Sequence, residues 1–344
     1  MEDEFGRLTD ALKKEYGIGS IRRLSELPPD AGITGWTPLG ISVIERELIG
    51  WSGIPDGRIV LVCGGEGSSK TTLAQHILLG AQKRGGIAVL EDTEHALDPI
   101  RAKNIGLDPN KIIYSQPDTV EDVFDHILSI CEGVSGKQPT CIVWDSFSAS
   151  PTRGELYGSG DAAKRNLKSG ILTQTEAQQG QIAGHAKIAS TQLRRVTAAI
   201  DKKNISLVIV VQSKEQIDFT GWGTGGPTFL AEAALKFHST LFFECKRGEL
   251  LKQGETPIGI KVKITCRKNK LAGTFMKTVS VDNLFASGFN EASNKFDKAL
   301  ELGLIKPESQ GWFSCDGKKA KFTKTQFESV LLEVPAIAKA LEGK

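Results

Sequence analysis

A glycine-rich segment between two apolar runs constrains this chain more than any other feature. Arg58–Cys63 (RIVLVC) is typical of a buried parallel strand, and Leu73–Gln82 has the pattern of a helix. Small residues in the loop between them let backbone N–H groups approach phosphate oxygens, and the helix N-terminus adds a favourable dipole. We therefore expect the loop to hold the phosphates of a nucleotide through Gly64, Gly65, Glu66, Gly67, Ser68, Ser69, Lys70, Thr71 and Thr72.

Two side chains of the loop and one at a neighbouring strand end predict a phosphate and metal site. Lys70 is expected to reach the β- and γ-phosphates, and the Thr71 hydroxyl is expected to coordinate Mg²⁺. Asp145 follows the apolar run Cys141–Trp144, and an acidic residue at such a strand end can hold the ion through its water shell. The predicted cofactors are therefore ATP and Mg²⁺.

Ser69 departs from the usual loop pattern, which has glycine directly before the lysine. A Cβ atom at this position restricts φ and can crowd the phosphate path. We expect slower ATP turnover or an altered nucleotide affinity, with binding retained.

Alternating strands and helices predict an α/β fold. Ile87–Leu90 and Leu207–Val211 are further short apolar runs, and the apolar residues between Val120 and Cys131 fall on one helical face. This alternation implies right-handed crossovers and a mostly parallel, twisted sheet flanked by helices. From Ile258 to Ile264 apolar and polar residues alternate, which predicts antiparallel, half-exposed strands at one end of the sheet.

Three parts are predicted along the chain. Residues 1–33 form a small N-terminal helical element for oligomerisation, residues 34–284 an ATPase core, and residues 285–344 a small α+β C-terminal domain. Four apolar residues of the first part recur at helical spacing: Phe5, Leu8, Leu12 and Tyr16. The C-terminal part is expected to contain two helices: Ala292–Leu302 and Thr325–Leu341.

Composition narrows the possible classes of protein. The formal net charge of the 344 residues is only +2, so a nucleic-acid partner would require cations concentrated on one surface. No apolar run approaches the ~18–20 residues of a membrane span, and the acidic Met1–Gly6 resembles no targeting peptide. The six cysteines include no C-x-x-C pair and the five histidines are dispersed, so no zinc site is expected. We expect a cytoplasmic protein.

Several segments, in the same order along the chain, resemble the bacterial-type RecA recombinases. The most distinctive is Glu94–Ile100 (EHALDPI). The others extend from the N-terminal part into the tail: Gly19–Leu24, Pro55–Leu61, Ser115–Thr119, Ala234–Phe237, Lys268–Lys270, Gly288–Asn290 and Gly311–Ser314. The chain is similar to this family over nearly its whole length, as a divergent member of cellular or phage origin.

This resemblance implies a RecA-like core with a phosphate loop and an ATP-dependent DNA recombinase. Such a protein forms helical filaments on single-stranded DNA, pairs that strand with homologous duplex DNA, and exchanges strands in recombination and repair. Its ATP lies between subunits of the homo-oligomer, and its ATPase depends on DNA.

The resemblance also implies roles for residues around the nucleotide. Glu94 orients or activates the water that attacks the γ-phosphate. Gln212, at a strand end, senses that phosphate and passes its presence to the following loop. Asp98 matches a position that contacts adenine. The family's next position has an aromatic residue that stacks on the base, and here Arg101, whose guanidinium plane can also stack, takes its place.

Lys268 and Lys270 match two family lysines that reach the ATP of the neighbouring subunit. There they act as arginine fingers do, by neutralising charge that develops in the transition state. Hydrolysis then depends on head-to-tail assembly of copies of the chain. The alternative is a solvated run of charges, since Lys261, Lys263 and Arg267 lie close by in sequence.

Two loops are expected to face DNA. The loop at about 153–184 is longer than the family's usual one, and its cations either reach a second DNA strand or are ordinary surface charges: Arg153, Lys164, Arg165 and Lys168. The loop at about 213–231 is rich in glycine, and its aromatic side chains can stack on bases. Its candidate DNA contacts are Lys214, Gln216, Phe219 and Trp222.

A helical face carries three more candidate DNA contacts. Lys187, Ser190 and Arg194 have the spacing of one face of a helix and match family positions that grip the DNA backbone. Phosphate contacts carry no sequence information, so DNA binding is expected to tolerate any sequence and to weaken steeply with salt.

Two other functions share parts of this pattern. A RecA-fold hexameric helicase would also have a phosphate loop and an acidic strand end, but the Glu94–Ile100 segment, the Lys268 and Lys270 pair and the tail argue against it. A mediator that binds ATP and joins filaments without strand exchange would explain Ser69 and Arg101, but it has no need of Glu94 and both lysines.

Overall fold

The computed structural model describes residues 2–17, 21, 24–26, 33–157, 174–201, 203–213, 229, 231–271, 276–309, 311–318 and 320–342. The chain forms two compact units, residues 1–34 and 35–344. The first contains the predicted helix, α1 (Glu2–Tyr16), and a short 3₁₀ turn, η1 (Leu24–Glu26). None of the helices in the described ranges combines the length and apolar character that a bilayer crossing needs.

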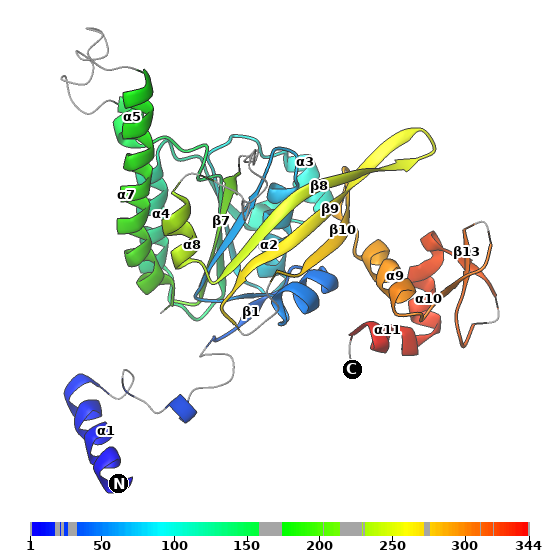
Figure 1. Ribbon diagram of the computed structural model, residues 1–344, viewed down its shortest axis with the longest axis horizontal. Helices are drawn as coiled ribbons and strands as arrows, with labels where there is room; N and C mark the ends of the chain where they lie inside the picture. The colour runs from blue at the N-terminus through cyan, green and yellow to red at the C-terminus, as the bar shows by residue number, and fades with distance from the viewer. Residues whose placement is uncertain are drawn as a thin grey trace, which may run out of the picture. The chain divides into compact units, whose positions relative to one another are not determined.

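The second unit is organised around a mixed sheet (Figure 1). Within the described residues it has nine strands, in the spatial order β11-β10-β9-β8-β3-β7-β6-β4-β5. The strands from β8 to β5 in that order are parallel, and β9, β10 and β11 extend the sheet antiparallel. Their bounds are β3 (Ile59–Gly64), β4 (Ile87–Asp92), β5 (Ile112–Ser115), β6 (Thr140–Asp145), β7 (Ile205–Gln212), β8 (Leu241–Gln253), β9 (Thr256–Asn269), β10 (Thr278–Leu284) and β11 (Gly288–Phe289). This arrangement confirms the predicted α/β class and the antiparallel end of the sheet.

Helices cover both faces of the parallel strands (Figure 1). On one face lie α2 (Lys70–Lys83), α3 (Pro99–Ile105) and the π-helical turn η2 (Ile44–Ile49). On the other lie α4 (Val120–Gly133), α7 (Gln174–Asp201) and α8 (Glu232–His238). Strands covered on both faces read as continuous apolar runs, which is why β3 and β6 were recognisable from sequence. Smaller elements complete this part: β1 (Trp36–Thr37), β2 (Ile54–Pro55), η3 (Pro109–Lys111) and α5 (Arg153–Tyr157).

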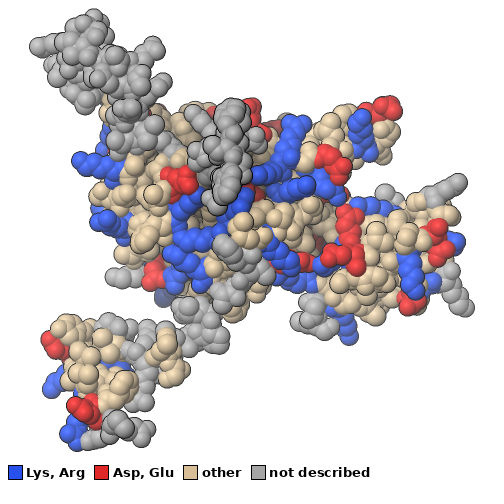
Figure 2. Space-filling view, in the orientation of Figure 1, with Lys and Arg blue, Asp and Glu red and all other residues tan. Residues whose placement is uncertain are grey.

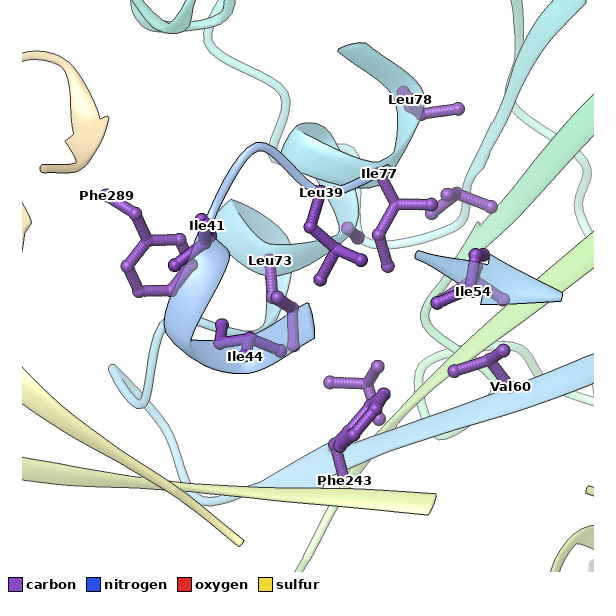
Figure 3. Close-up of a cluster of buried hydrophobic side chains, with 14 of the residues drawn as sticks. Leu39, Ile41, Ile44, Ile54, Val60, Leu73, Ile77, Leu78, Phe243 and Phe289 are labelled. Atoms are coloured by element: carbon purple, nitrogen blue, oxygen red, sulfur yellow. The ribbon is translucent and has the colours of Figure 1, made fainter. Parts of the chain in front are cut away.

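The core under α2 fixes the helix that begins at the phosphate loop. Leu73, Ile77 and Leu78 of α2 pack with Ile44 of η2 and Val60 of β3 in one buried cluster (Figure 3). Each such side chain contributes about 1.5–3 kcal/mol when fully buried. The first turn of α2 is therefore held rigidly at the carboxyl edge of β3.

The C-terminal residues form a small α+β unit with its own apolar cluster, which includes Phe296, Phe322 and Phe327. Its elements are α9 (Glu291–Glu301), β12 (Lys306–Pro307), β13 (Trp312–Ser314), β14 (Phe322–Thr323), η4 (Lys324–Gln326), α10 (Phe327–Glu333) and α11 (Pro335–Glu342). The single helix expected at Thr325–Leu341 is wrong. Pro335 has no N–H to donate and excludes helical backbone at Val334, whose φ is −124° and ψ 77°, so the segment divides there.

Candidate functional site

The carboxyl edge of the parallel strands brings the predicted nucleotide residues together. In the sheet order, β3, β7, β6 and β4 are neighbours, and all four end at this edge. Gly64 ends β3, Gln212 ends β7, Asp145 ends β6, and Glu94 follows β4 by two residues. Ligands of open parallel sheets bind beyond this edge, where the connecting loops converge.

The loop between β3 and α2 is closely packed and requires glycine at its start. A Cβ atom on Gly64 would lie 2.3 Å from the carbonyl oxygen of Cys245 on β8, and Gly67 has a φ of +65°. The Lys70 ammonium donates to the Gly65 carbonyl over 2.8 Å, and Ser68 Oγ donates to the same oxygen over 2.7 Å. Lys70 therefore lies across the loop whose phosphate-binding role the sequence predicts.

Asp145 has the features of a metal-holding carboxylate. Its side chain is buried, and within the described structure Oδ1 has no hydrogen-bond partner. The Thr71 hydroxyl lies beside the carboxylate and favours its charged form. Burial raises the pKa of Asp145 to about 6, with a smaller contribution from the Glu94 charge, while Thr71 and Lys70 oppose the shift. A buried carboxylate oxygen without a partner, beside a hydroxyl, fits a divalent cation.

Glu94 is the centre of a hydrogen-bonded group that joins three strand ends. Its Oε1 accepts from Gln212 Nε2 over 2.8 Å and from Ser146 Oγ over 2.6 Å. The backbone N–H groups of Thr93 and Glu94 donate to the Asp145 carbonyl, which ties the end of β4 to that of β6. Sequence reasoning missed Ser146, although its place directly after Asp145 at the same strand end was a usable signal.

Asp98 and Arg101 are both engaged with protein groups. Asp98 is the N-cap of α3, where its carboxylate accepts from the N–H groups of Ile100 and Arg101. The Arg101 guanidinium donates to Thr72 Oγ1 over 2.8 Å and to the Phe285 carbonyl over 3.1 Å. Arg101 thus connects the phosphate-loop helix to the turn after β10, and stacking on a base stays a prediction. Phe285 was not singled out from the sequence.

The two candidate trans-acting lysines lie at the end of α8. Lys268 Nζ donates to the carbonyls of Lys236 and Phe237, and Lys270 Nζ donates to that of Phe237 over 3.1 Å. Cations are favoured beside the last carbonyls of a helix. Desolvation, followed by repulsion from Lys270, lowers the pKa of Lys268 to about 8.

Arg194 belongs to the same positive neighbourhood. Desolvation lowers the pKa of His238, and the charges of Arg194, Lys270 and Lys268 lower it further. All three cations are therefore close to His238. On α7, Lys187 and Arg194 are exposed and Ser190 is half-buried, whereas the opposite face packs into the core through Ala189, Leu193, Val196 and Ile200. Figure 2 shows Lys and Arg side chains gathered over α8 and along the β8–β9 hairpin, which is how a chain of net charge +2 can present a basic surface.

The predicted DNA loops lie largely outside the described residues. Lys214, Gln216, Phe219 and Trp222 of the second loop fall outside them, as do three cations of the first: Lys164, Arg165 and Lys168. Arg153 is described, and its guanidinium pairs with Asp122 over 2.5 Å and Asp125 over 2.9 Å on α4. These pairs raise the pKa of Arg153 and favour the surface-charge interpretation for that residue.

Comparison with known proteins assigns the chain to a family. A sequence model of the RecA N-terminal domain matches residues 6–290. The chain belongs to the RecA family. It is 32% identical over 337 residues to Protein RecA of Heliobacterium modesticaldum, a match that covers 97% of this chain and 89% of that protein. It is 33% identical over 336 residues to Protein RecA of Nautilia profundicola, covering 97% and 88% of the two chains.

Family membership establishes the function predicted from the motifs. The chain is a DNA-dependent ATPase and a recombinase that binds nucleotide, forms filaments, and acts on single-stranded and duplex DNA in recombination and repair. The RecA match over 97% of the chain favours neither the helicase nor the mediator. Within the described residues, no group of three or more His, Cys, Asp or Glu side chains is placed to hold a metal ion.

Proposed function

We propose that this RecA-family chain binds ATP with Mg²⁺ at the carboxyl edge of β3, β4, β6 and β7, and hydrolyses it with Glu94. The observation that carries this proposal is the group formed by Glu94, Gln212 and Ser146 next to the phosphate loop. A general base needs a fixed orientation, and two donors on one carboxylate oxygen provide it. Within the described residues these two bonds leave the other oxygen of Glu94 open to accept a proton from water.

Four side chains have separate roles at the phosphate end of the site. Backbone N–H groups of the loop and the Lys70 ammonium bind the β- and γ-phosphates. Thr71 and Asp145 would hold Mg²⁺, which when bound neutralises charge on the phosphate oxygens. Glu94 orients the attacking water, and the Lys70 charge stays with the phosphates throughout the reaction.

Gln212 and the lysine pair connect the nucleotide to DNA and to assembly. Gln212 contacts Glu94 and lies directly before the second DNA loop, so a change at the γ-phosphate reaches that loop through one side chain. Lys268 and Lys270 supply positive charge to the ATP of a neighbouring subunit. Lys187, Ser190 and Arg194 on α7, together with the second loop, bind the DNA backbone and bases.

The domain boundaries and the location of the protein are part of the same proposal. Residues 1–33 serve oligomerisation, 34–284 the ATPase core and 285–344 a C-terminal domain. The separate apolar cluster around Phe296 and Phe327 supports a C-terminal domain of its own. All six cysteines are free thiols, which supports a reducing, cytoplasmic location.

Replacing Asp145 with asparagine tests the site without requiring turnover. The amide removes a negative charge beside Thr71 while keeping the shape of the side chain, so nucleotide affinity should lose its dependence on Mg²⁺. We expect Mg²⁺ to tighten ATP binding at least about tenfold in the wild type and by less than about twofold in the Asp145→Asn variant, measured by calorimetry. A matched control is Asp125→Asn on the exposed side of α4. Equal Mg²⁺ dependence in wild type and Asp145→Asn would contradict the assignment.

A further inference from the structure

Ser69 has a backbone conformation that residues with side chains rarely adopt. Its φ is 69° and its ψ 25°, in the left-handed region, where a Cβ atom is strained and glycine is not. Its carbonyl accepts from the Leu73 N–H over 3.0 Å, in the first turn of α2. A shift at Ser69 would therefore move the junction between the phosphate loop and its helix.

A side chain from a distant strand contacts Ser69. Asn283 Nδ2 on β10 donates to Ser69 Oγ over 2.7 Å, although 214 positions separate the two residues. Asn283 is only 3% exposed. Within the described structure its Oδ1 has no partner, so Ser69 is the one hydrogen-bonding partner that its amide has there. A buried amide is costly without a bond, so the contact with Ser69 explains why a polar residue occupies this place.

The end of β10 is held firmly enough to act as a fixed support. Asn283 lies opposite Ile260 of β9 and Phe289 of β11, between two strands. The preceding residue, Asp282, donates its N–H to Asn294 Oδ1 over 3.0 Å and accepts from Ser293 Oγ over 2.5 Å. The Asn283 amide therefore approaches Ser69 from a backbone fixed on both sides.

We propose that Asn283 is a positioning residue of the phosphate loop, whose amide holds Ser69 in the left-handed conformation that glycine supplies in the usual pattern. Ser69 and Asn283 then act as a pair. Because Ser69 Oγ accepts from Asn283, its own proton is still free to be donated. Replacing Ser69 with glycine removes the backbone strain at this position but leaves the buried Asn283 amide without its partner. The S69G variant alone is therefore not expected to bind nucleotide more tightly. The proposal rests on the proposed nucleotide site.

A double-mutant cycle tests whether the two residues act as a pair. Four proteins are compared: wild type, S69G, N283A and S69G/N283A, with the affinity for ADP and Mg²⁺ measured by calorimetry. We expect N283A to weaken ADP binding about tenfold when Ser69 is present, and by less than about twofold in the S69G background. Steady-state ATPase should show the same coupling in KM, with little in kcat. Equal effects of N283A in the two backgrounds would overturn the proposal.

An asparagine far from the phosphate loop supplies the control. Asn204 donates its side-chain amide to the Gly136 carbonyl over 2.8 Å and directly precedes β7, at the end of that strand opposite to Gln212. N204A should lower the melting temperature but leave ADP affinity within about twofold, both with and without S69G. Should N283A fail to fold, N283L removes the donor while keeping the branched shape and the number of non-hydrogen atoms of the side chain, and the same coupling is expected.

Lys70→Ala distinguishes a misplaced nucleotide site from a failure of the Asn283 proposal alone. If Lys70→Ala abolishes ADP binding and the cycle is additive, the nucleotide site stands and the Asn283 proposal fails. If Lys70→Ala leaves ADP binding unchanged, the nucleotide site itself is misplaced and the Asn283 proposal fails with it.

Discussion

Replacing Lys268 with alanine is expected to lower DNA-stimulated ATP turnover about a thousandfold, the size of effect seen when a charge supplied by a neighbouring subunit is removed. Nucleotide affinity of the free protein should stay within about twofold of wild type, because Lys268 bonds to the end of α8 and, within the described structure, not to its own phosphate loop. The measurement is steady-state ATPase with and without single-stranded DNA, beside direct ATP binding.

Lys268 also has contacts within its own subunit, and the Lys268→Ala variant therefore needs a control. An ammonium has three N–H donors, so Lys268 can keep the Lys236 and Phe237 carbonyls and still contact a neighbouring phosphate. Lys252→Ala changes an exposed lysine on the β8–β9 hairpin and should leave stimulation intact. In the subunit alone, desolvation and Lys270 lower the pKa of Lys268 to about 8, so its positive charge is lost there as pH rises through that value. Full stimulation in Lys268→Ala would refute the trans role.

Replacing Glu94 with glutamine is expected to lower turnover about 10²–10⁴-fold while ATP binding and assembly on DNA persist. An amide oxygen can still accept from Gln212 and Ser146, so the hydrogen-bonded group should keep its geometry. Only the ability to take a proton from water is lost. The variant should therefore remain on single-stranded DNA after wild type has hydrolysed its ATP and dissociated.

The Glu94 prediction is checked by two measurements on the same samples. Phosphate release gives the turnover, and fluorescence anisotropy of a labelled oligonucleotide gives the lifetime on DNA. Glu249→Gln on the exposed hairpin is the matched control and should behave as wild type. Loss of DNA binding together with turnover would indicate a structural role for Glu94 and contradict its assignment as the base.

The sheet and its active edge were predictable because they depend on local patterns. Strands buried on both faces are continuous apolar runs, and because β6 and β7 run parallel, Asp145 and Gln212 end at the same edge of the sheet. The phosphate loop was recognisable for the same reason, since its glycines and Lys70 are contiguous.

Contacts made between distant segments were not predictable. The bond from Asn283 to Ser69 depends on how β10 is placed beside β9, and nothing near either residue in the sequence indicates it. The hydrogen bond from Arg101 to Thr72 and the one from Lys268 to the Phe237 carbonyl at the end of α8 were not predictable for the same reason. At Pro335 the rule was available, but the apolar spacing continues across the break and concealed it.

Assembly on DNA is the most direct measure of the central claim, which is that ATP bound between copies of the chain joins them into a filament. Purified protein would be mixed with a long single-stranded oligonucleotide and a slowly hydrolysed ATP analogue, and viewed by electron microscopy. We expect helical filaments with the analogue and none with ADP. Monomers on the oligonucleotide, or closed rings, in the presence of the analogue would contradict it.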